Sequence, residues 1–429
     1  MYSDDNFLLT SSALKHLIEQ QNGSYLTLGE TLRKAKNENS STGILENSRK
    51  FMMFGDPAQN LALPKHTLAV TSINDKSISA VPDTFSSLQT VKVSGYVAQH
   101  NGDKLGNFNG KLYINIFDKP SKLTTRGNDK GSYPRDYYVQ KNTIFKGIAA
   151  IKNGEWEFSF IIPKDINYSL GQGKMSLYAT DEKNTDAASY FEGFYIGGTS
   201  SDSLVDDKPP VVQLFMNDDK FVTGGITDEN PKIYSKLSDD TGINISGSSI
   251  GHDILAVLDR DSRNPIILNS YFKSELNEFK KGEILYPLKD LSPGTHTLTL
   301  TAWDLSNNLG EATLEFQVKN SENPSIDHVY NFPNPFSTRT QFQFETNISG
   351  SELEVQIRIQ SISGKVVRTI GQKIKPNGYR IDNINWDGKD DFGNPLANGV
   401  YLYRVHVSSS DPSGSVKKSS DYQKLLILR

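Results

Sequence analysis

The side chains that could carry out chemistry are few in this chain and lie far apart in the sequence. The chain has no cysteine, which excludes disulfides, thiolate metal sites and a catalytic thiol within it. None of its seven histidines is spaced from another as in a metal site such as HxxxH; they are His16, His66, His100, His252, His296, His328 and His406. His252 and Asp253 could suggest a catalytic dyad, but neighbours on a strand point to opposite faces. We therefore expect a structural role for both.

A group of carboxylates near the end of the chain has a weak resemblance to a calcium loop. Asp387, Asp390 and Asp391 do not follow the EF-hand spacing, so we expect them to form turns. No phosphate-binding, dinucleotide-binding or serine-nucleophile motif is present. The sequence therefore predicts no catalytic residue, no metal ligand and no cofactor in this chain.

The overall charge also limits the possible partners. Lys and Arg number 46 and Asp and Glu 50, which gives a net charge of −4. This balance favours neither nucleic acid nor an anionic membrane as a partner. No apolar run approaches the length of a membrane-spanning segment.

The most regular pattern lies in residues 323–429 and predicts a small β-sandwich. Val355, Ile357 and Ile359 alternate with polar residues, as in a strand with one buried face. Gly364 follows in a predicted hairpin turn, where glycine supplies a positive φ. Residues 423–429, which contain the apolar run 425–428, are expected to form an exposed last strand that pairs with or docks on a partner.

Two further β-sandwiches are predicted upstream, over residues 67–204 and 205–322. In the first, Asn153-Gly154 predicts a hairpin turn, and residues 118–142 are expected to be a mobile loop. In the second, immunoglobulin-like sandwich, apolar residues alternate with threonines at 295–302, which predicts a strand with one buried face. Polar, Pro-containing stretches near residues 200–210 and 320–324 are expected to be linkers.

Residues 1–66 are predicted to be an incomplete α/β segment. Ser11-Ser12 could cap a first helix, and Thr27 with Glu30 matches the capping box of a second. Residues 51–54 are apolar and predict a buried strand. Two helices and one strand cannot close a core, so we expect this segment to need a partner sheet.

The motifs of the last segment resemble those of the sorting domain of type IX secretion cargo in Bacteroidetes, which is grouped with the FlgD-type immunoglobulin-like domain. The matching motifs lie in turns and at strand edges. With the apolar end of the chain they give the expected sorting and docking residues: Pro333, Asn334, Pro335, Phe336, Gly364, Trp386, Asp387, Gly388, Gly399, Tyr401, Leu425 and Leu428.

The first 66 residues add a second resemblance. Thr27-Leu28-Gly29-Glu30 and Gly55-Asp56-Pro57-Ala58 are similar to the end of the gingipain-family (caspase-type) cysteine peptidase domain. Over its whole length the chain resembles the carboxy-terminal half of the type IX secretion sortase, a member of that family. The middle matches are residues 163–168, Gly251-His252-Asp253-Ile254 and residues 301–308.

The resemblance implies a function and an address. Sortases of this family are cysteine endopeptidases at the outer surface that remove the sorting domain from cargo and link the cargo to anionic lipopolysaccharide. Both catalytic residues, a cysteine and a histidine, lie upstream of the matched segment, so this chain is expected to be inactive alone. It would be the accessory and docking part, bound to the outer-membrane shuttle protein (PorV in this family) and other attachment-complex components. Cargo sorting domains would be met through the full-length enzyme.

Two alternatives remain open from the sequence. The chain could be part of a gingipain-like cargo protease, or a non-enzymatic surface adhesin or structural protein secreted by the same system. Its start has no basic and apolar signal-peptide pattern, although an exported protein needs an export signal. We therefore expect a longer protein of which this is the carboxy-terminal part.

Overall fold

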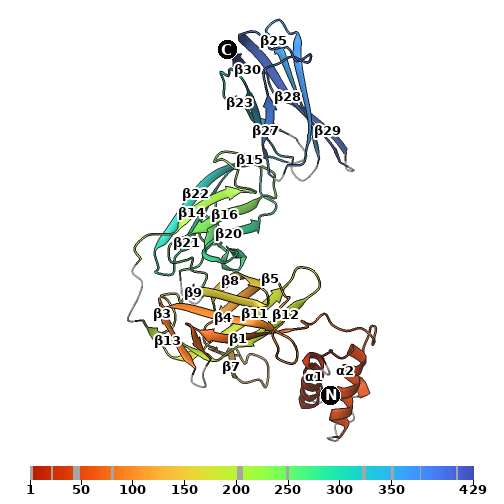
Figure 1. The fold of residues 1–429 in the computed structure, drawn as a ribbon, viewed down its shortest axis with the longest axis vertical. Coiled ribbons are helices and arrows are strands. Elements are labelled where there is room, and N and C mark those ends of the chain that lie inside the picture. Colours follow the sequence, from red (N-terminus) through yellow and green to blue (C-terminus); the bar gives the residue numbers. More distant parts are fainter. Residues whose placement is uncertain are drawn as a thin grey trace.

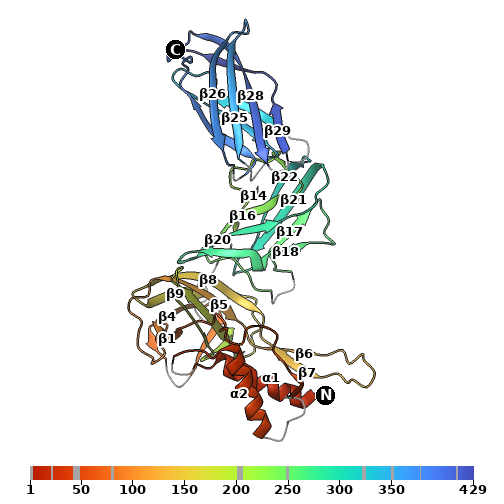
Figure 2. The same ribbon diagram turned by 90° about the vertical axis from the view of Figure 1, so that its right-hand side faces the viewer.

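The computed structural model describes residues 3–20, 23–41, 49–78, 82–200, 206–247, 251–320, 325–348, 352–376, 378–411 and 414–429. The chain is mainly β, which confirms the predicted fold class. Two helices come first, and three β units follow one another along the long axis of the molecule (Figure 1). The two termini lie at opposite ends, so the last unit is far from the helices (Figure 2).

The helical segment consists of α1 (Ser3–Ile18) and α2 (Leu28–Ser41). The helix start expected at Ser11-Ser12 is wrong. α1 begins about two turns earlier, at Ser3. The negative charges of Asp4 and Asp5 in its first turn interact favourably with the positive end of the helix dipole. The start of α2 is as predicted, since Thr27 Oγ1 accepts a hydrogen bond of 3.3 Å from the Glu30 amide.

The buried strand expected at residues 51–54 is wrong. These residues form no strand, and Phe54 is 92% exposed. The α/β character expected for residues 1–66 is therefore absent from the described part of this segment. Several apolar side chains of this segment stay exposed instead: Phe7, Leu8, Leu14, Ile18, Phe51, Met52, Phe54 and Leu61.

The first β unit combines an eight-stranded sheet (β12-β11-β5-β8-β9-β4-β1-β2), a three-stranded sheet (β10-β13-β3) and the hairpin β6-β7. Its strands are β1 (Thr67–Ile73), β2 (Lys76–Ser77), β3 (Asp83–Ser87), β4 (Thr90–Ala98), β5 (Gly110–Phe117), β6 (Ser121–Thr124), β7 (Asp136–Val139), β8 (Thr143–Lys152), β9 (Glu155–Ile161), β10 (Gly171–Gln172), β11 (Lys174–Thr180), β12 (Asp186–Phe191) and β13 (Phe194–Thr199). The larger sheet curls, because His66 before β1 exchanges backbone hydrogen bonds with β12 (His66 N to Asp186 O, 3.2 Å; Ala188 N to His66 O, 3.1 Å). One hydrophobic cluster fills the interior.

Two sequence expectations for this unit have different outcomes. The Asn153-Gly154 turn is confirmed: both residues have positive φ, 51° and 78°, and they join β8 to β9. The loop expected at residues 118–142 is wrong in part, because β6 and β7 pair within it. Figure 2 shows this hairpin projecting from the unit.

The second β unit is a sandwich of a four-stranded sheet (β14-β16-β20-β19) and a five-stranded sheet (β15-β22-β21-β17-β18). Its elements are β14 (Val211–Met216), β15 (Ile226–Thr227), β16 (Lys232–Ser238), β17 (Leu255–Leu258), β18 (Ile266–Ile267), the 3₁₀ turn η1 (Asn269–Tyr271), β19 (Phe272–Glu275), β20 (Glu278–Pro287), β21 (Gly294–Trp303) and β22 (Leu309–Val318). The predicted alternation in β21 is confirmed, since His296, Leu298, Leu300 and Ala302 are all buried.

The third β unit is a smaller sandwich of β23-β24-β27 against β26-β25-β28-β29, with β30 also paired to β28. Its strands are β23 (Ile326–Phe332), β24 (Thr340–Thr346), β25 (Leu353–Ser361), β26 (Val366–Ile374), β27 (Arg380–Trp386), β28 (Gly399–Asp411), β29 (Gly414–Ser419) and β30 (Gln423–Ile427). The predicted inward row of Val355, Ile357 and Ile359 is buried, and Gly364 has a φ of 85° in its turn. Both predictions are confirmed.

Candidate functional site

Most of the expected sorting and docking residues lie at the end of the third unit that carries the C-terminus, which Figure 1 shows far from the helices. Strand register explains this. The start of β28 pairs with the ends of β25 and β30, through Tyr401–Ser361 and Gly399–Ile427, while Trp386 at the end of β27 pairs with Thr340 at the start of β24. The turns that follow and precede these strands therefore meet at one place, which we call the distal end.

The Pro333–Phe336 segment is fastened to β30. Asn334 donates from Nδ2 to the Lys424 carbonyl (3.0 Å) and accepts at Oδ1 from the Leu426 amide (2.9 Å). The Phe336 amide donates to the Leu426 carbonyl at 3.0 Å, and the Leu428 amide to the Phe336 carbonyl at 2.9 Å. β30 thus lies between β28 and this segment.

The expectation of an exposed last strand is therefore wrong for part of β30. Leu425 and Ile427 are 1% and 0% exposed in the core of the sandwich, and of the apolar residues 425–428 only Leu428 is largely exposed, at 52%. The sequence pattern could not distinguish the two cases, because a short apolar run is typical of both a buried and an exposed strand. Leu425 contributes to folding and does not present a docking surface.

Beneath the surface of the distal end, aromatic side chains from two motifs pack together. Phe336 and Trp386 are both 3% exposed, with ring centroids 5.6 Å apart. The indole Nε1 of Trp386 donates to the Lys389 carbonyl at 2.9 Å, which closes the turn at Gly388. That glycine has a φ of 70°, and a Cβ there would lie 2.8 Å from the Arg429 guanidinium.

Arg429, which the sequence reasoning did not select, joins three segments of the distal end. Its Nε donates to the Ser337 carbonyl (3.0 Å), Nη1 to the Leu396 carbonyl (2.9 Å) and Nη2 to the Gly388 carbonyl (3.0 Å). A planar guanidinium can hold several acceptors at fixed angles. No local pattern indicates this role, since the three carbonyls lie 33–92 residues before Arg429 in the sequence.

The remaining motif residues have local tasks. The Pro333 carbonyl accepts from Thr340 Oγ1 at 2.8 Å, and Tyr401 donates its hydroxyl to the Ala397 carbonyl at 3.0 Å. Asp387 Oδ1 accepts from the Lys389 amide at 3.2 Å. Asp390 Oδ1 accepts from the amides of Phe392 and Asn394, so the expected turn-forming role is confirmed for Asp387 and Asp390. Asp391 Oδ1 accepts instead from the Thr369 amide of β26 at 3.1 Å.

Several apolar side chains of the distal end are exposed. They come from turns and strand ends, and they are Phe332 (68% exposed), Ile362 (75%), Val366 (47%), Phe392 (90%), Val400 (41%) and Leu428 (52%). Exposed apolar side chains gathered at one end of a domain are a feature of contact surfaces. Only Leu428 was selected from the sequence. Phe392 had a signal, because a phenylalanine between Asp391 and Gly393 lies in a turn and cannot reach a core.

The histidines are mostly paired with carboxylates, and they do not form a catalytic set. The Nδ1 atoms of His252, His296 and His328 lie 2.9, 2.7 and 2.9 Å from oxygens of Asp165, Asp259 and Glu345, respectively. His252 is paired with Asp165 and not with Asp253, which agrees with the structural role expected for it. His406 contacts Ser419 Oγ at 2.6 Å across two strands, and the pKa of its imidazole is lowered by burial and by the charges of Arg358 and Arg404.

One group of carboxylates in the described residues is close enough to share a cation. Single oxygens of Asp206, Asp239 and Asp304 lie within 4.8 Å of one another. Asp304 is fully buried. Burial raises the pKa of its carboxyl, and the negative charge of Asp239 raises it further. These residues are spread over a hundred positions, so no spacing in the sequence marks them.

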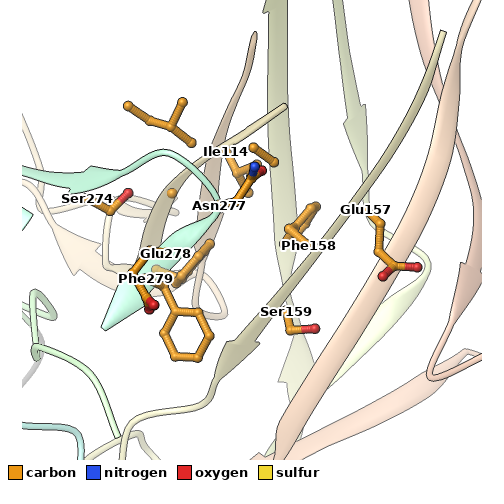
Figure 3. A pocket seen from close by; sticks show the side chains of 12 residues that line it. Ile114, Glu157, Phe158, Ser159, Ser274, Asn277, Glu278 and Phe279 are labelled. Carbon is orange, nitrogen blue, oxygen red and sulfur yellow. The ribbon is translucent and has the colours of Figure 1, made fainter. Parts of the chain in front are cut away.

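A cavity of about 230 Å³ lies where the first and second units meet. Figure 3 shows Ser274, Asn277 and Phe279 from the β19–β20 hairpin on one side, with Phe158 and Ser159 of β9 on the other. Of its lining residues only Glu157 and Glu278 ionise, and no nucleophile is paired with a base there. The cavity gives no support for an active site.

Residues 333–411 match the FlgD Ig-like domain family. Over 96% of its length the chain is 31% identical to dimeric latent PorU from Porphyromonas gingivalis, with a TM-score of 0.41. The chain is PorU-like. It spans 39% of the PorU chain that it matches.

The PorU-like character expected from the sequence is thus confirmed, together with the Ig-like domain at the end of the chain. More distant matches include fibronectin(III)-like modules of CbhA from Clostridium thermocellum (11% identity, 51% of this chain, 93% of that one, TM-score 0.20). The FN1–FN3 domains of chicken CNTN1 also match (10% identity, 84% of this chain, 99% of that one, TM-score 0.20). None of the curated proteins matches the chain. No helix in the described residues of this PorU-like chain is long and apolar enough to cross a membrane.

Proposed function

We propose that this chain is the docking and accessory part of a type IX secretion sortase at the cell surface. The observation that carries the proposal is the 31% identity to PorU over 96% of the chain. In the whole protein, a cysteine peptidase domain would remove sorting domains from cargo and link the cargo to surface lipopolysaccharide. This chain has no cysteine and would supply neither catalytic residue.

The helical segment fits a role beside a larger peptidase domain. Phe7, Leu14 and Ile18 of α1 are 71%, 54% and 65% exposed, although they are spaced for one face of a helix. An apolar helix face contributes to stability only when another surface covers it and removes it from water. An adhesin built of β-sandwiches has no need of such a face, so this feature favours the sortase over the adhesin alternative.

The division of the chain after residues 66, 204 and 322 remains part of the proposal. The three hydrophobic clusters lie within those limits. Residues 201–205 and 321–324, where two linkers were expected, lie outside the described residues.

The distal end is the proposed contact with the outer-membrane shuttle protein. Its exposed apolar side chains supply the apolar contact area, and the hydrogen bonds of Arg429 and Asn334 keep its turns in fixed positions. Preorganised turns lose little conformational entropy when a partner binds. Removal of residues 425–429 is a poor test, because it takes Leu425 and Ile427 out of the core.

A sharper test replaces side chains that only the surface uses. The double variant Ile362→Ser and Phe392→Ser, made in the full-length protein, should fold normally and lose binding to the purified shuttle protein and retention at the cell surface. Tyr190→Ser, which changes a 69% exposed side chain of the first unit, is the matched control and should retain both. Normal binding and retention of the double variant would refute docking through this end.

The enzymatic part of the proposal has a separate test. A peptidase assay should compare this chain with the extended protein that includes upstream sequence. Cleavage of a cargo sorting domain by the extended protein alone is expected. The adhesin alternative is favoured if the extended protein does not cleave the sorting domain and if cargo still attaches to the cell surface without this chain.

A further inference from the structure

A second cavity lies where the second and third units meet. Its volume is about 330 Å³, within the range of ligand cavities, about 300–1,000 Å³. The segment between β14 and β15 lines one side of it with Val222, Thr223 and Gly225, and the β23-β24-β27 sheet lines the other. Figure 1 shows β15 and β27 on either side of this place. The cavity is thus separate from the distal end, which lies at the opposite end of β27.

Two opposite charges line this cavity as direct neighbours in the sheet. Glu345 of β24 and Arg380 of β27 are paired in the strand register, so their Cβ atoms lie roughly 5 Å apart on one face of the sheet. Opposite charges in this arrangement attract each other across the strands. In the described structure each of the two side chains is nevertheless bonded to other groups. Both therefore keep hydrogen-bonding capacity for a ligand.

The guanidinium of Arg380 is held in place but only partly used. Its Nη2 donates to Tyr330 Oη and to Gln343 Oε1, each at 2.8 Å, which fixes the orientation of the plane. Its Nε and Nη1 donate to no other residue in the described part of the chain. A charged donor that is already oriented loses little conformational entropy when it binds an anion.

The carboxylate of Glu345 is also only partly used, although its side chain is just 10% exposed. Its Oε2 accepts from the Ile226 amide at 3.1 Å and lies 2.9 Å from Nδ1 of His328. Its Oε1 has no donor among the described residues. A carboxylate with so little exposure is stabilised by a further donor, and most strongly by a charged one.

We propose that this cavity binds a free amino acid with an apolar side chain. The carboxylate of the ligand accepts from Nε or Nη1 of Arg380, and its ammonium donates to Oε1 of Glu345. An α-amino acid carries both charges on one carbon atom, which suits charged groups on neighbouring strands, whereas a peptide holds its terminal charges farther apart. The apolar side chain of the ligand lies against Val222 and Val329.

The charge balance of the cavity favours a zwitterion over a simple carboxylate. Besides Glu345 and Arg380, only His328 and Tyr330 among the lining residues can ionise, and they already contact Glu345 and Arg380, respectively. A ligand with a carboxylate alone would place a second negative charge beside Glu345. A ligand with both charges compensates the two protein groups at once, so the ammonium contributes to selectivity.

Saturation-transfer NMR on the whole chain tests the proposal with L-leucine as the probe. Titration up to about 10 mM detects a dissociation constant as weak as about 1 mM. Three analogues each lack one feature: N-acetyl-L-leucine lacks the ammonium, L-leucinamide lacks the carboxylate, and glycine lacks the apolar side chain. We expect each analogue to bind at least roughly tenfold more weakly than L-leucine, because each loses one of the three contacts.

Variants of the chain assign the binding to this cavity. Arg380→Gln should weaken L-leucine binding at least roughly tenfold, because the carboxylate loses its charged donor. Arg358→Gln, at an exposed arginine of β25 in the same unit, is the matched control and should leave binding unchanged. Val222→Trp is a second variant, at a side chain that is 49% exposed, so it tests the cavity even if Arg380→Gln does not fold. Its larger side chain fills the cavity and should abolish binding.

Three results would overturn the inference. The first is that L-leucine shows no saturation transfer at about 10 mM. The second is that N-acetyl-L-leucine or L-leucinamide binds as tightly as L-leucine, since the two charged contacts would then not select the ligand. The third is that Val222→Trp leaves binding unchanged, or that Arg358→Gln weakens it as much as Arg380→Gln does, since the ligand would then bind elsewhere.

Discussion

Replacement of Arg429 tests whether the distal end is held together by one guanidinium. In Arg429→Ala the carbonyls of Ser337, Gly388 and Leu396 lose their shared donor. A hydrogen bond to a charged group contributes about 1.5–3 kcal/mol when it is shielded, and much less where water can replace it. Only the Gly388 contact is partly buried, so we expect a loss of about 2 kcal/mol in the free energy of unfolding of the third unit.

Hydrogen exchange of third-unit peptides, measured on the whole chain, gives the assay. A loss of 2 kcal/mol corresponds to a roughly 30-fold fall in protection of the β30 and β28 amides. Arg429→Lys should recover only part of it, because one ammonium cannot satisfy three carbonyls in different directions. Arg339→Ala, at an exposed arginine in the same end of the unit, is the control and should stay within about 0.5 kcal/mol.

Protection unchanged in Arg429→Ala would show that water or neighbouring groups replace the guanidinium at no cost. Full recovery in Arg429→Lys would show that charge alone, and not the planar geometry, is needed. Either result refutes the reasoning that this side chain fixes the turns of the proposed docking surface.

Three further predictions concern the interiors of the units. Tyr403 is fully buried with no hydrogen-bond partner for its hydroxyl in the described structure, and burial raises the pKa of its phenol. Tyr403→Phe should therefore stabilise the third unit by about 1 kcal/mol in urea unfolding. Tyr401→Phe, which loses the hydrogen bond to the Ala397 carbonyl, should not stabilise it. Burial alone would lower the pKa of His296, but the Ser292 carbonyl and the Asp259 carboxylate outweigh it and raise that pKa. Its stabilising contribution is therefore full below about pH 6.5 and is lost as the pH rises through the higher folded-state value, and urea midpoints of the His296→Gln variant should lack this dependence. A Cβ at Gly95 would lie 2.0 Å from the Ala69 carbonyl oxygen and 2.3 Å from the Trp156 ring, whereas a Cβ at Gly371 would meet nothing within 4 Å. In thermal unfolding, Gly95→Ala should therefore cost more than about 2 kcal/mol and Gly371→Ala less than about 0.5 kcal/mol. Equal costs would contradict the predicted clash.

Local patterns predicted the β-strands and turns well because they reflect short-range preferences. The alternation around Val355 and around Leu298 depends only on one face being buried, and Gly364 and Asn153-Gly154 follow from the φ angles their turns need. Residues 51–54 failed because an apolar run forms a strand only where a neighbouring strand supplies hydrogen bonds, and no described residue supplies them there.

The sequence by itself determined that the chain is a series of β units without thiol chemistry, and its turn motifs marked the residues of the distal end. Tertiary structure alone decided that Leu425 is buried. It also decided that His252 pairs with Asp165 and that Arg429 joins three turns. The physical reason is the distance along the chain: each of these relationships links residues brought together by strand register and unit packing, which no local pattern encodes.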